Sequence, residues 1–300
     1  MEHYGLVSQL LQYFVTGVTV GSIYAIVGVG FNIIYNSTEI INFAQGEFVM
    51  LGGLVMVTMV HTVHLPMPLA FLITIVIVTL VGLLMERLAI FPLKDTAVLR
   101  LVIITLALSI LIRGLAMFVW GKDSFALKPF SGDTPLQILG AAVVPQTLWI
   151  IGITVVLVVL LSLFFSRTII GKAMNACADN PEAASLVGIN TQRMVMLSFM
   201  LSAGLGAVAG MIITPIALME YDRGAMLALK GFGACILGGL GNFYGAIMAG
   251  IILGLIESYG AGLISSGYKD AMALAVLLLV LFIKPRGLLG SAEVTQLKKF

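Results

Sequence analysis

The chain has 300 residues, of which 60% are hydrophobic and 10% are charged, and its formal net charge is +2. An ordinary soluble domain carries about one quarter charged residues, so the composition excludes that class and predicts a polytopic membrane protein. No cluster of Lys or Arg is large enough to neutralise several phosphates, which argues against a nucleic-acid partner.

Nine apolar segments of about the length that crosses a bilayer follow one another along the chain. The seventh is short, is interrupted by Gly residues and carries Lys230, so it can either cross or enter and bend back. The sequence therefore predicts an all-α polytopic membrane protein with nine transmembrane or broken helices. They lie at about residues 11–34, 40–60, 69–91, 99–119, 147–166, 194–217, 226–241, 243–263 and 269–284.

The N-terminus and the two cysteines add little to this interpretation. The stretch MEHYGLVSQLLQYFVTG has no Lys or Arg and no cleavage site after a short apolar core, so we expect it to stay in the mature chain. Cys177 and Cys235 have neither metal-ligand nor redox spacing. We therefore expect no metal site and no structural disulfide.

The distribution of Lys and Arg predicts the orientation of the chain, because positive connections stay in the cytoplasm. The connections at about 61–68 and 121–146 have no excess of positive charge, so we expect them outside, together with the N-terminus. Three positive connections are expected in the cytoplasm. Their basic residues are Arg87, Lys94 and Arg100, then Arg167, Lys172 and Arg193, and finally Lys284, Arg286, Lys298 and Lys299.

The second apolar segment contains polar residues at a depth where they are costly unless they face a cavity or a partner. Asn42, Gln45 and Gly46 lie within about one helical turn, and Glu47 follows them. This pattern predicts a half-helix beside a substrate path. An equally weighted alternative is that Gln45 and Glu47 bond to neighbouring helices. Arg113, near the outer end of the fourth segment, is expected to extend toward the membrane surface.

A polar stretch, GKAMNACADNPEAASLVGIN at residues 171–190, separates the fifth and sixth segments. It carries the signals of a helix of about two turns: a cap, a first-position Pro, an acidic residue, two Ala residues and a terminating Gly. A cytoplasmic helix of this kind can transmit the motion of a soluble partner into the membrane, and an ordinary loop helix is the alternative. The residues concerned are Asp179 or Asn180, Pro181, Glu182, Ala183, Ala184 and Gly188.

The stretch at residues 228–254 is rich in Gly, with pairs of Gly residues four positions apart. This spacing brings membrane helices into close contact, and we favour close packing over a loop that holds a ligand. Glu257, in the eighth segment, is explained equally by a bond to a neighbouring helix or by exposure near the outer surface. The pairs are Gly241 with Gly245 and Gly250 with Gly254.

Motifs for chemistry are missing from the sequence. At Gly171-Lys172, a phosphate loop would need a Gly where Ser166 stands and a Ser or Thr where Ala173 stands. There is no Gly-x-Ser-x-Gly and no His-Glu-x-x-His motif. We therefore expect a transport subunit without its own ATPase site, which is not an enzyme and has no catalytic residues.

Several motifs, in order along about residues 10–293, carry a resemblance to a known family. They are INFAQGEFVMLGG, ERLAIFPL, the 171–190 stretch, LKGFGACILGGLGNFYGAIMAGIILGLIES and YKDAMALAVLLLVLFIKPRGLLG. Together they resemble the branched-chain amino acid ABC importer permeases, specifically the H-type subunit of the Liv system. Gln45 stands where that family usually has His, and residues 198–201 read SFML where the wider importer loop motif has Ile-x-Leu-Pro.

The resemblance implies the ABC importer permease fold as one transmembrane domain, residues 1–300, with a cytoplasmic coupling loop at 168–193 that docks on an ATPase. It implies a homologous M-type permease, two cytoplasmic ATPase subunits and a periplasmic binding protein as partners. It implies the bacterial inner membrane as location, with ATP and Mg bound by the partner ATPases and no cofactor in this chain. The matching coupling residues are Asn180, Pro181, Glu182, Ala183, Ala184 and Gly188, and the matching path residues are Asn42, Gln45, Gly46 and Glu47.

Two other functions are compatible with the sequence. Related importers carry urea, short amides or other small amino acids, so the cargo is not fixed by these residues. A secondary transporter or channel for small solutes is the alternative from another class, and it would be expected to keep ionisable relay residues deep in several segments. Glu47 and Glu257 are the candidates for such residues.

Overall fold

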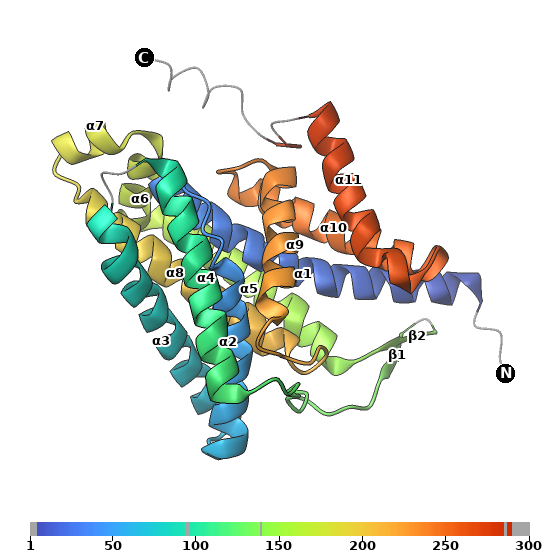
Figure 1. Ribbon diagram of the computed structural model, residues 1–300. Coiled ribbons are helices and arrows are strands. Elements are labelled where there is room, and N and C mark those ends of the chain that lie inside the picture. The colour runs from blue at the N-terminus through green and yellow to red at the C-terminus, as the bar shows by residue number, and fades with distance from the viewer. Residues whose placement is uncertain (1–4, 94–96, 139, 285–286, 290–300) are drawn as a thin grey trace.

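The computed structural model describes residues 5–93, 97–138, 140–284 and 287–289. In this part of the chain the protein is almost wholly helical, with one small hairpin of two strands (Figure 1). The α-helices are α1 (Leu6–Thr38), α2 (Gln45–Val57), α3 (Met67–Met85), α4 (Val98–Trp120), α5 (Pro145–Arg167), α6 (Ile169–Asp179), α7 (Pro181–Leu186), α8 (Thr191–Ile213), α9 (Arg223–Gly238), α10 (Phe243–Leu263) and α11 (Lys269–Ile283). The shorter elements are π-helical turns at Thr58–Thr62 and Glu86–Ile90, 3-10 turns at Phe91–Leu93 and Ser266–Tyr268, and strands β1 (Leu136–Ile138) and β2 (Ala141–Val143).

Seven helices among the described residues are long and apolar enough to cross a membrane, and each overlaps one of the nine predicted segments. The remaining two predictions, at 40–60 and 226–241, fall on shorter helices. α2 has 13 residues and is extended by the π-helical turn, while residues 40–44 are not helical. α9 has 16 residues, about 24 Å at 1.5 Å per residue, which is shorter than the roughly 30 Å apolar core of a bilayer. The predicted count of nine is therefore approximate.

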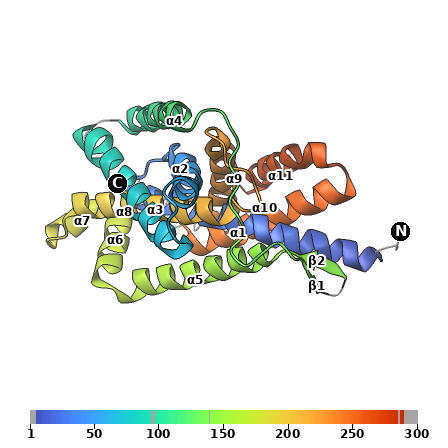
Figure 2. The same cartoon turned by 90° about the horizontal axis from the view of Figure 1, so that it is seen from below.

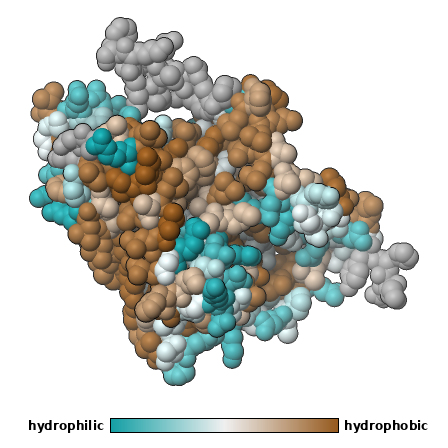
Figure 3. Space-filling view, in the orientation of Figure 1, coloured by the Kyte–Doolittle hydropathy of each residue, from teal (hydrophilic) through white to brown (hydrophobic). Residues whose placement is uncertain are grey.

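α1, α2 and α8 form the interior of the bundle. Every residue of α2 is buried, including the polar Gln45 and Glu47 in its first turn, and the rest of the helix is apolar all round. Figure 2 shows α4 at one edge of the bundle and α5 at the opposite edge, with α1, α2, α8 and α10 between them. The outer helices α3, α4 and α11 keep apolar flanks toward the surroundings, and Figure 3 shows these brown surfaces.

The predicted close packing at the Gly pairs is confirmed where α10 crosses α1. A Cβ on Gly21 would lie 2.7 Å from the Cα of Ile251, and a Cβ on Gly254 would collide with the backbone of Gly17 and Gly21. Real Cβ atoms do not approach other atoms so closely, so both helices need Gly at the crossing. The two long helices can therefore lie backbone against backbone.

The connections gather at the two ends of the bundle (Figure 1). At one end, Ser8 Oγ near the start of α1 donates to the Gly140 carbonyl of the strand hairpin at 2.6 Å. At the other end, Asn36 Nδ2 near the end of α1 donates to the Gly241 carbonyl at 3.2 Å, and α6 and α7 project nearby (Figure 1). The end of α3, the starts of α4 and α8, the ends of α5 and α11, and α6 also lie at this second end (Figure 1). These elements carry or adjoin six of the basic residues that were predicted to share one side, namely Arg87, Arg100, Arg167, Lys172, Arg193 and Lys284. The other four, Lys94, Arg286, Lys298 and Lys299, lie outside the described residues.

α9 connects these two ends. The segment before α9 pairs with the connection after α4, because Phe125 and Met219 exchange two backbone hydrogen bonds of 2.9 Å. The turn after α9 meets the end of α1, where Asn32 Oδ1 accepts the Gly241 N–H at 2.8 Å. The segment at 226–241 therefore passes from one end of the bundle to the other, and does not bend back.

Candidate functional site

The segment between α1 and α2 brings the predicted path residues into the bundle. Asn42 Oδ1 accepts the backbone N–H of Ala44 at 3.1 Å, the local turn that Asn side chains favour. α2 then begins at Gln45. The helix thus begins inside the segment predicted at 40–60, after the non-helical residues 40–44, as expected of a broken helix.

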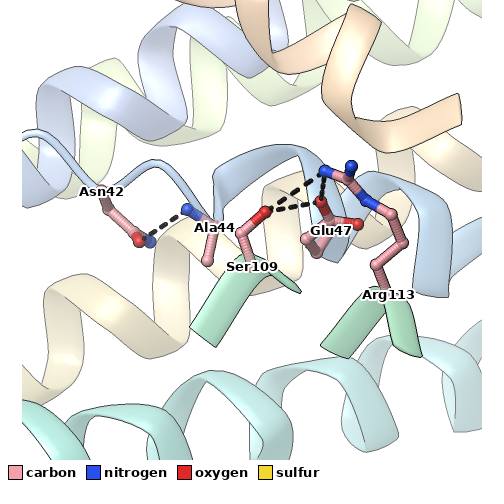
Figure 4. A network of polar contacts seen from close by, with 5 residues as sticks. All are labelled: Asn42, Ala44, Glu47, Ser109 and Arg113. Atoms are coloured by element: carbon pink, nitrogen blue, oxygen red, sulfur yellow. Dashed lines mark hydrogen bonds and ion pairs between the residues drawn. The ribbon is translucent and has the colours of Figure 1, made fainter. Parts of the chain in front are cut away.

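Glu47 in the first turn of α2 reaches the peripheral helix α4 (Figure 4). Its Oε1 accepts from Ser109 Oγ and from Arg113 Nη2, both at 2.8 Å. The Glu47 side chain is 1% exposed and that of Arg113 is 31% exposed. Ser109 and Arg113 are four residues apart, so both face α2 from one side of α4. The prediction that Arg113 extends toward the membrane surface is wrong, because its guanidinium turns inward to a buried carboxylate.

Several atoms of this network have no hydrogen-bond partner among the described residues. They are Oε2 of Glu47, Nε of Arg113 and Nδ2 of Asn42, all of which are buried. A Cβ built on Gly224 of α9 would lie 3.1 Å from Glu47 Oε2, so bare backbone borders that oxygen. The site therefore has one hydrogen-bond acceptor and two hydrogen-bond donors without a partner in the described part of the chain.

Gln45 and Gly46 face other neighbours. Gln45 is fully buried, and Ser202 Oγ of α8 lies 2.6 Å from its Oε1 and 2.8 Å from the Gly30 carbonyl of α1. Gly46 meets Gly224 so closely that a Cβ on it would collide with the Gly224 carbonyl. These two residues pack helices together, so the structure does not gather all four predicted path residues on one surface.

The predicted coupling helix is α7, and the residues expected to cap it do so. Asn180, not Asp179, is the cap, and its Oδ1 accepts the Ala183 N–H at 2.9 Å. Gly188 has φ +89°, and the N–H groups of Gly188 and Ile189 bond at 3.0 Å to the carbonyls of Ser185 and Ala184. This pair of bonds is the Schellman arrangement that ends helices.

α7 has one buried residue, Ala184, whose exposed fraction is 4%. Leu186 and Val187, next to it, are 88% and 78% exposed. The helix therefore packs against the rest of the protein through Ala184, and the apolar side chains of Leu186 and Val187 face outward.

Sequence reasoning missed α6, which makes the first half of the polar stretch helical. Thr168 Oγ1 caps it by accepting the Gly171 N–H at 2.9 Å, and Gly171, Met174 and Cys177 are its buried residues. The three-residue spacing of this face and the capping Thr could have indicated the helix. Burial raises the pKa of the Cys177 thiol above its ordinary value.

A second polar cluster was also missed, at the contact of α1, α9, α10 and α11. Lys230 Nζ lies 2.7 Å from Glu257 Oε1 and 2.6 Å from Asp270 Oδ1. Tyr24 OH donates to Glu257 Oε2 at 2.7 Å. Of the two explanations for Glu257, a bond to neighbouring helices is therefore correct. Among the described residues, no group of three or more His, Cys, Asp or Glu side chains could hold a metal ion.

A bundle of membrane-spanning helices with a broken interior helix and buried ion pairs defines the class of multi-pass transport proteins. The family described as "Branched-chain amino acid transport system / permease component" matches residues 13–281 of the chain. The chain therefore belongs to this family of permease components, which confirms the resemblance carried by the motifs. It is a multi-pass protein of the inner membrane.

Curated relatives match the chain over almost its whole length. The high-affinity branched-chain amino acid transport system permease protein LivH of Escherichia coli K12 is 33% identical, and LivH of Salmonella typhimurium LT2 is 32% identical. BraD of Pseudomonas aeruginosa, which carries the same description, is 31% identical. Each alignment covers 95% of this chain and 97% of the relative. Among solved structures, PsaBC from Streptococcus pneumoniae in complex with Fab matches with a TM-score of 0.46 and 14% identity, over 95% of this chain and 93% of that chain.

Proposed function

We propose that this chain is the membrane permease subunit of an ATP-driven importer that moves branched-chain amino acids into the cytoplasm. The family and the descriptions of its relatives support this cargo. The sequence has no phosphate-binding loop of its own, so the energy comes from two partner ATPase subunits that bind ATP and Mg. A homologous M-type permease and a periplasmic binding protein complete the assembly.

The observation that carries the proposal is the exposed apolar pair Leu186–Val187 on the capped helix α7. Leu186 at the end of α7 and its C-cap Val187 lie on a helix that projects from the bundle, where exposed apolar side chains suit a contact with another protein. Asn180 and Gly188 fix both ends of α7, so the pair is presented on a rigid support. In this proposal Asn180, Pro181, Glu182, Ala183, Ala184 and Gly188 shape the helix, and Leu186 and Val187 touch the ATPase.

Motion of α7 can be transmitted into the membrane through α8, the next helix in the chain. Asn190 caps α8 by accepting the Arg193 N–H at 3.0 Å, so α8 follows α7 after a short turn. α8 then runs through the bundle, where its Gly206 and Gly210 lie directly against α2. ATP binding closes the partner ATPases and displaces α7 and α8. This motion shifts α2 with Glu47, and the preceding turn with Asn42, between outward and inward openings.

The experiment that tests the proposal replaces Leu186 and Val187 together with Glu. The chain is coexpressed with its candidate permease, ATPase and binding-protein partners and reconstituted in liposomes. We expect the double variant to insert normally, to lose copurifying ATPase, and to lose ATP-dependent leucine uptake by about tenfold or more.

A matched control is the double change of Leu263 and Ile264 to Glu. These adjacent apolar residues at the end of α10 are 65% and 72% exposed, and they lie at the opposite end of the bundle. The control should keep its ATPase partners. Full uptake by the α7 variant would contradict the proposal.

A secondary transporter is a second candidate, because Lys230 and Glu257 form a buried ion pair of the kind such proteins use, with the partly exposed Asp270 beside it. The two mechanisms differ in their energy source. Uptake that follows an imposed proton gradient without ATP, and that is lost in Glu257→Gln, would favour the secondary transporter. Uptake that needs ATP and survives Glu257→Gln favours the importer.

A further inference from the structure

The contact between α2 and α4 holds two charged groups that are each incompletely satisfied. Glu47 Oε1 is bonded to Arg113 and Ser109, whereas Glu47 Oε2 and Arg113 Nε have no hydrogen-bond partner in the described part of the chain. Glu47 is almost completely buried, and an unpaired buried oxygen is energetically unfavourable. The pair therefore offers an acceptor on one side and a donor on the other.

We infer that Glu47 and Arg113 form a transient recognition site for the two charged groups of an α-amino acid. The ammonium group would lie against Glu47 Oε2, and the carboxylate would lie against the Arg113 guanidinium, whose planar N–H groups suit carboxylates. This inference rests on the proposed function and names the residues that contact the charged groups of the transported amino acid. The side chain of the amino acid takes no part in these contacts.

Charge balance favours such a ligand. Glu47 and Arg113 together carry no net charge, and neither does an amino-acid zwitterion, so binding leaves no unpaired charge inside the membrane. An amine or a carboxylic acid alone would bring one charge into the membrane without its counter-charge. Urea and short amides are neutral, so they could hydrogen-bond to both groups but would lack the two charge-to-charge contacts of a zwitterion. The site therefore favours an amino acid over the urea and short-amide cargoes that the sequence left open.

The surrounding helices allow a ligand to reach the pair. α4 presents a narrow buried stripe to the bundle, formed by Leu101, Thr105, Ser109 and Ala116. Lightly packed elements of this kind open more readily than core helices. The Arg113 side chain is 31% exposed, so part of it stays at the surface while its Nη2 reaches the buried carboxylate. Gly224 adds no side chain beside Glu47 Oε2.

The test uses photo-leucine, a diazirine analogue of leucine that keeps both charged groups, on the assembled transporter in lipid nanodiscs. After irradiation, peptides that carry the adduct are identified by mass spectrometry. We expect adducts on α2, α4 or the start of α9. Glu47→Gln and Arg113→Met should each lower the yield about tenfold or more, as expected when one partner of a buried charged contact is removed.

Glu257→Gln is the matched control, since it neutralises a buried carboxylate that pairs with Lys230 and lies away from α4. It should leave the yield unchanged. Competition on the wild-type complex needs no variant: leucine should suppress the adduct, whereas 3-methylbutylamine, 4-methylpentanoate and urea should not. If Glu47→Gln or Arg113→Met does not assemble, these competition measurements on the wild-type complex test the recognition site by themselves.

Unchanged labelling in Glu47→Gln or in Arg113→Met, an adduct elsewhere, or suppression by 3-methylbutylamine, 4-methylpentanoate or urea would overturn the inference. ATP-dependent leucine uptake is measured on the same preparations. Normal uptake together with any of those labelling results rejects the recognition site alone. A wild-type complex that takes up no leucine rejects the proposed function itself.

Discussion

Lys230 of α9 and Glu257 of α10 form a buried ion pair in which Nζ lies 2.7 Å from Oε1. The same ammonium lies 2.6 Å from Asp270 Oδ1 of α11, and Tyr24 of α1 donates to the second oxygen of Glu257. One cation thus links three helices, and a fourth joins through a hydroxyl. The link through Lys230 matters most for α11, because this helix has just two buried residues, Ala273 and Leu277.

Replacing Lys230 with Met should destabilise the protein strongly. The change leaves Glu257 without its cation inside the bundle, and one uncompensated buried charge costs about 3–5 kcal/mol. Asp270 loses the same partner, but its side chain is 38% exposed, so water compensates much of that loss. Glu257→Gln should cost about 1–2 kcal/mol, because Tyr24 and Lys230 keep hydrogen-bond partners and the Lys230–Asp270 pair remains. The free energy of unfolding in detergent, followed by tryptophan fluorescence, measures both. Equal and small losses would show that the cluster does not hold the helices together.

A second prediction concerns the crossing of α1 and α10. Gly254→Ala should destabilise the protein by about 1–3 kcal/mol, because the added methyl group collides with the backbone of Gly17 and Gly21. Gly114→Ala is the matched control, since a Cβ there meets nothing within 4 Å. Gly114 lies inside α4, so Ala should stabilise the helix by about 0.5–1 kcal/mol. Unfolding midpoints of the two variants should move in opposite directions, and a shift in the same direction would contradict this interpretation of the crossing.

The cap of α7 gives a third prediction. Asn180→Ala removes the side-chain bond to the Ala183 N–H and should destabilise α7 by about 1 kcal/mol. Asp179→Ala is the control, because Asp179 is exposed at the end of α6 and does not cap α7. Hydrogen exchange should quicken in residues 183–187 of the first variant and stay unchanged in the second. Equal exchange in both would show that the cap does not order the helix.

Local features of this protein could be predicted from the sequence. The cap at Asn180, the Gly188 terminus and the pair Gly250 and Gly254 each depend on residues within one or two turns of each other, and the structure has the cap, the terminus and a close helix contact at the pair. The apolar segments were predictable for the same reason, since each long span is a continuous run. α6 was missed although its signals are equally local, namely the capping Thr168 and the three-residue spacing of Gly171, Met174 and Cys177.

The polar contacts of the site could not be predicted, because they join distant parts of the chain. Arg113 lies 66 residues from Glu47, and Tyr24 lies 233 residues from Glu257. A single sequence indicates that a buried charge needs a partner but not which helix lies beside it. Arg113 was therefore expected to turn outward, although an inward partner was available.

A last prediction tests where α7 points and what covers it. Leu186→Cys places a thiol at a position that is 88% exposed in the wild type. It should react with a membrane-impermeant maleimide in inverted membrane vesicles, whose cytoplasmic face is outward, and not in intact spheroplasts. Bound partner ATPases should protect it by about tenfold or more, because a docked surface excludes the reagent.

The native cysteines should contribute little to this labelling. Cys177 is 3% exposed, and burial raises the pKa of its thiol, so at neutral pH it holds less of the reactive thiolate than a free cysteine does. Cys235 is fully buried. Ile264→Cys, at the opposite end of the bundle, is the positional control and should react in spheroplasts. If Leu186→Cys instead reacted from the spheroplast side, or reacted equally fast with the ATPases bound, α7 could not be the segment through which ATP drives the permease.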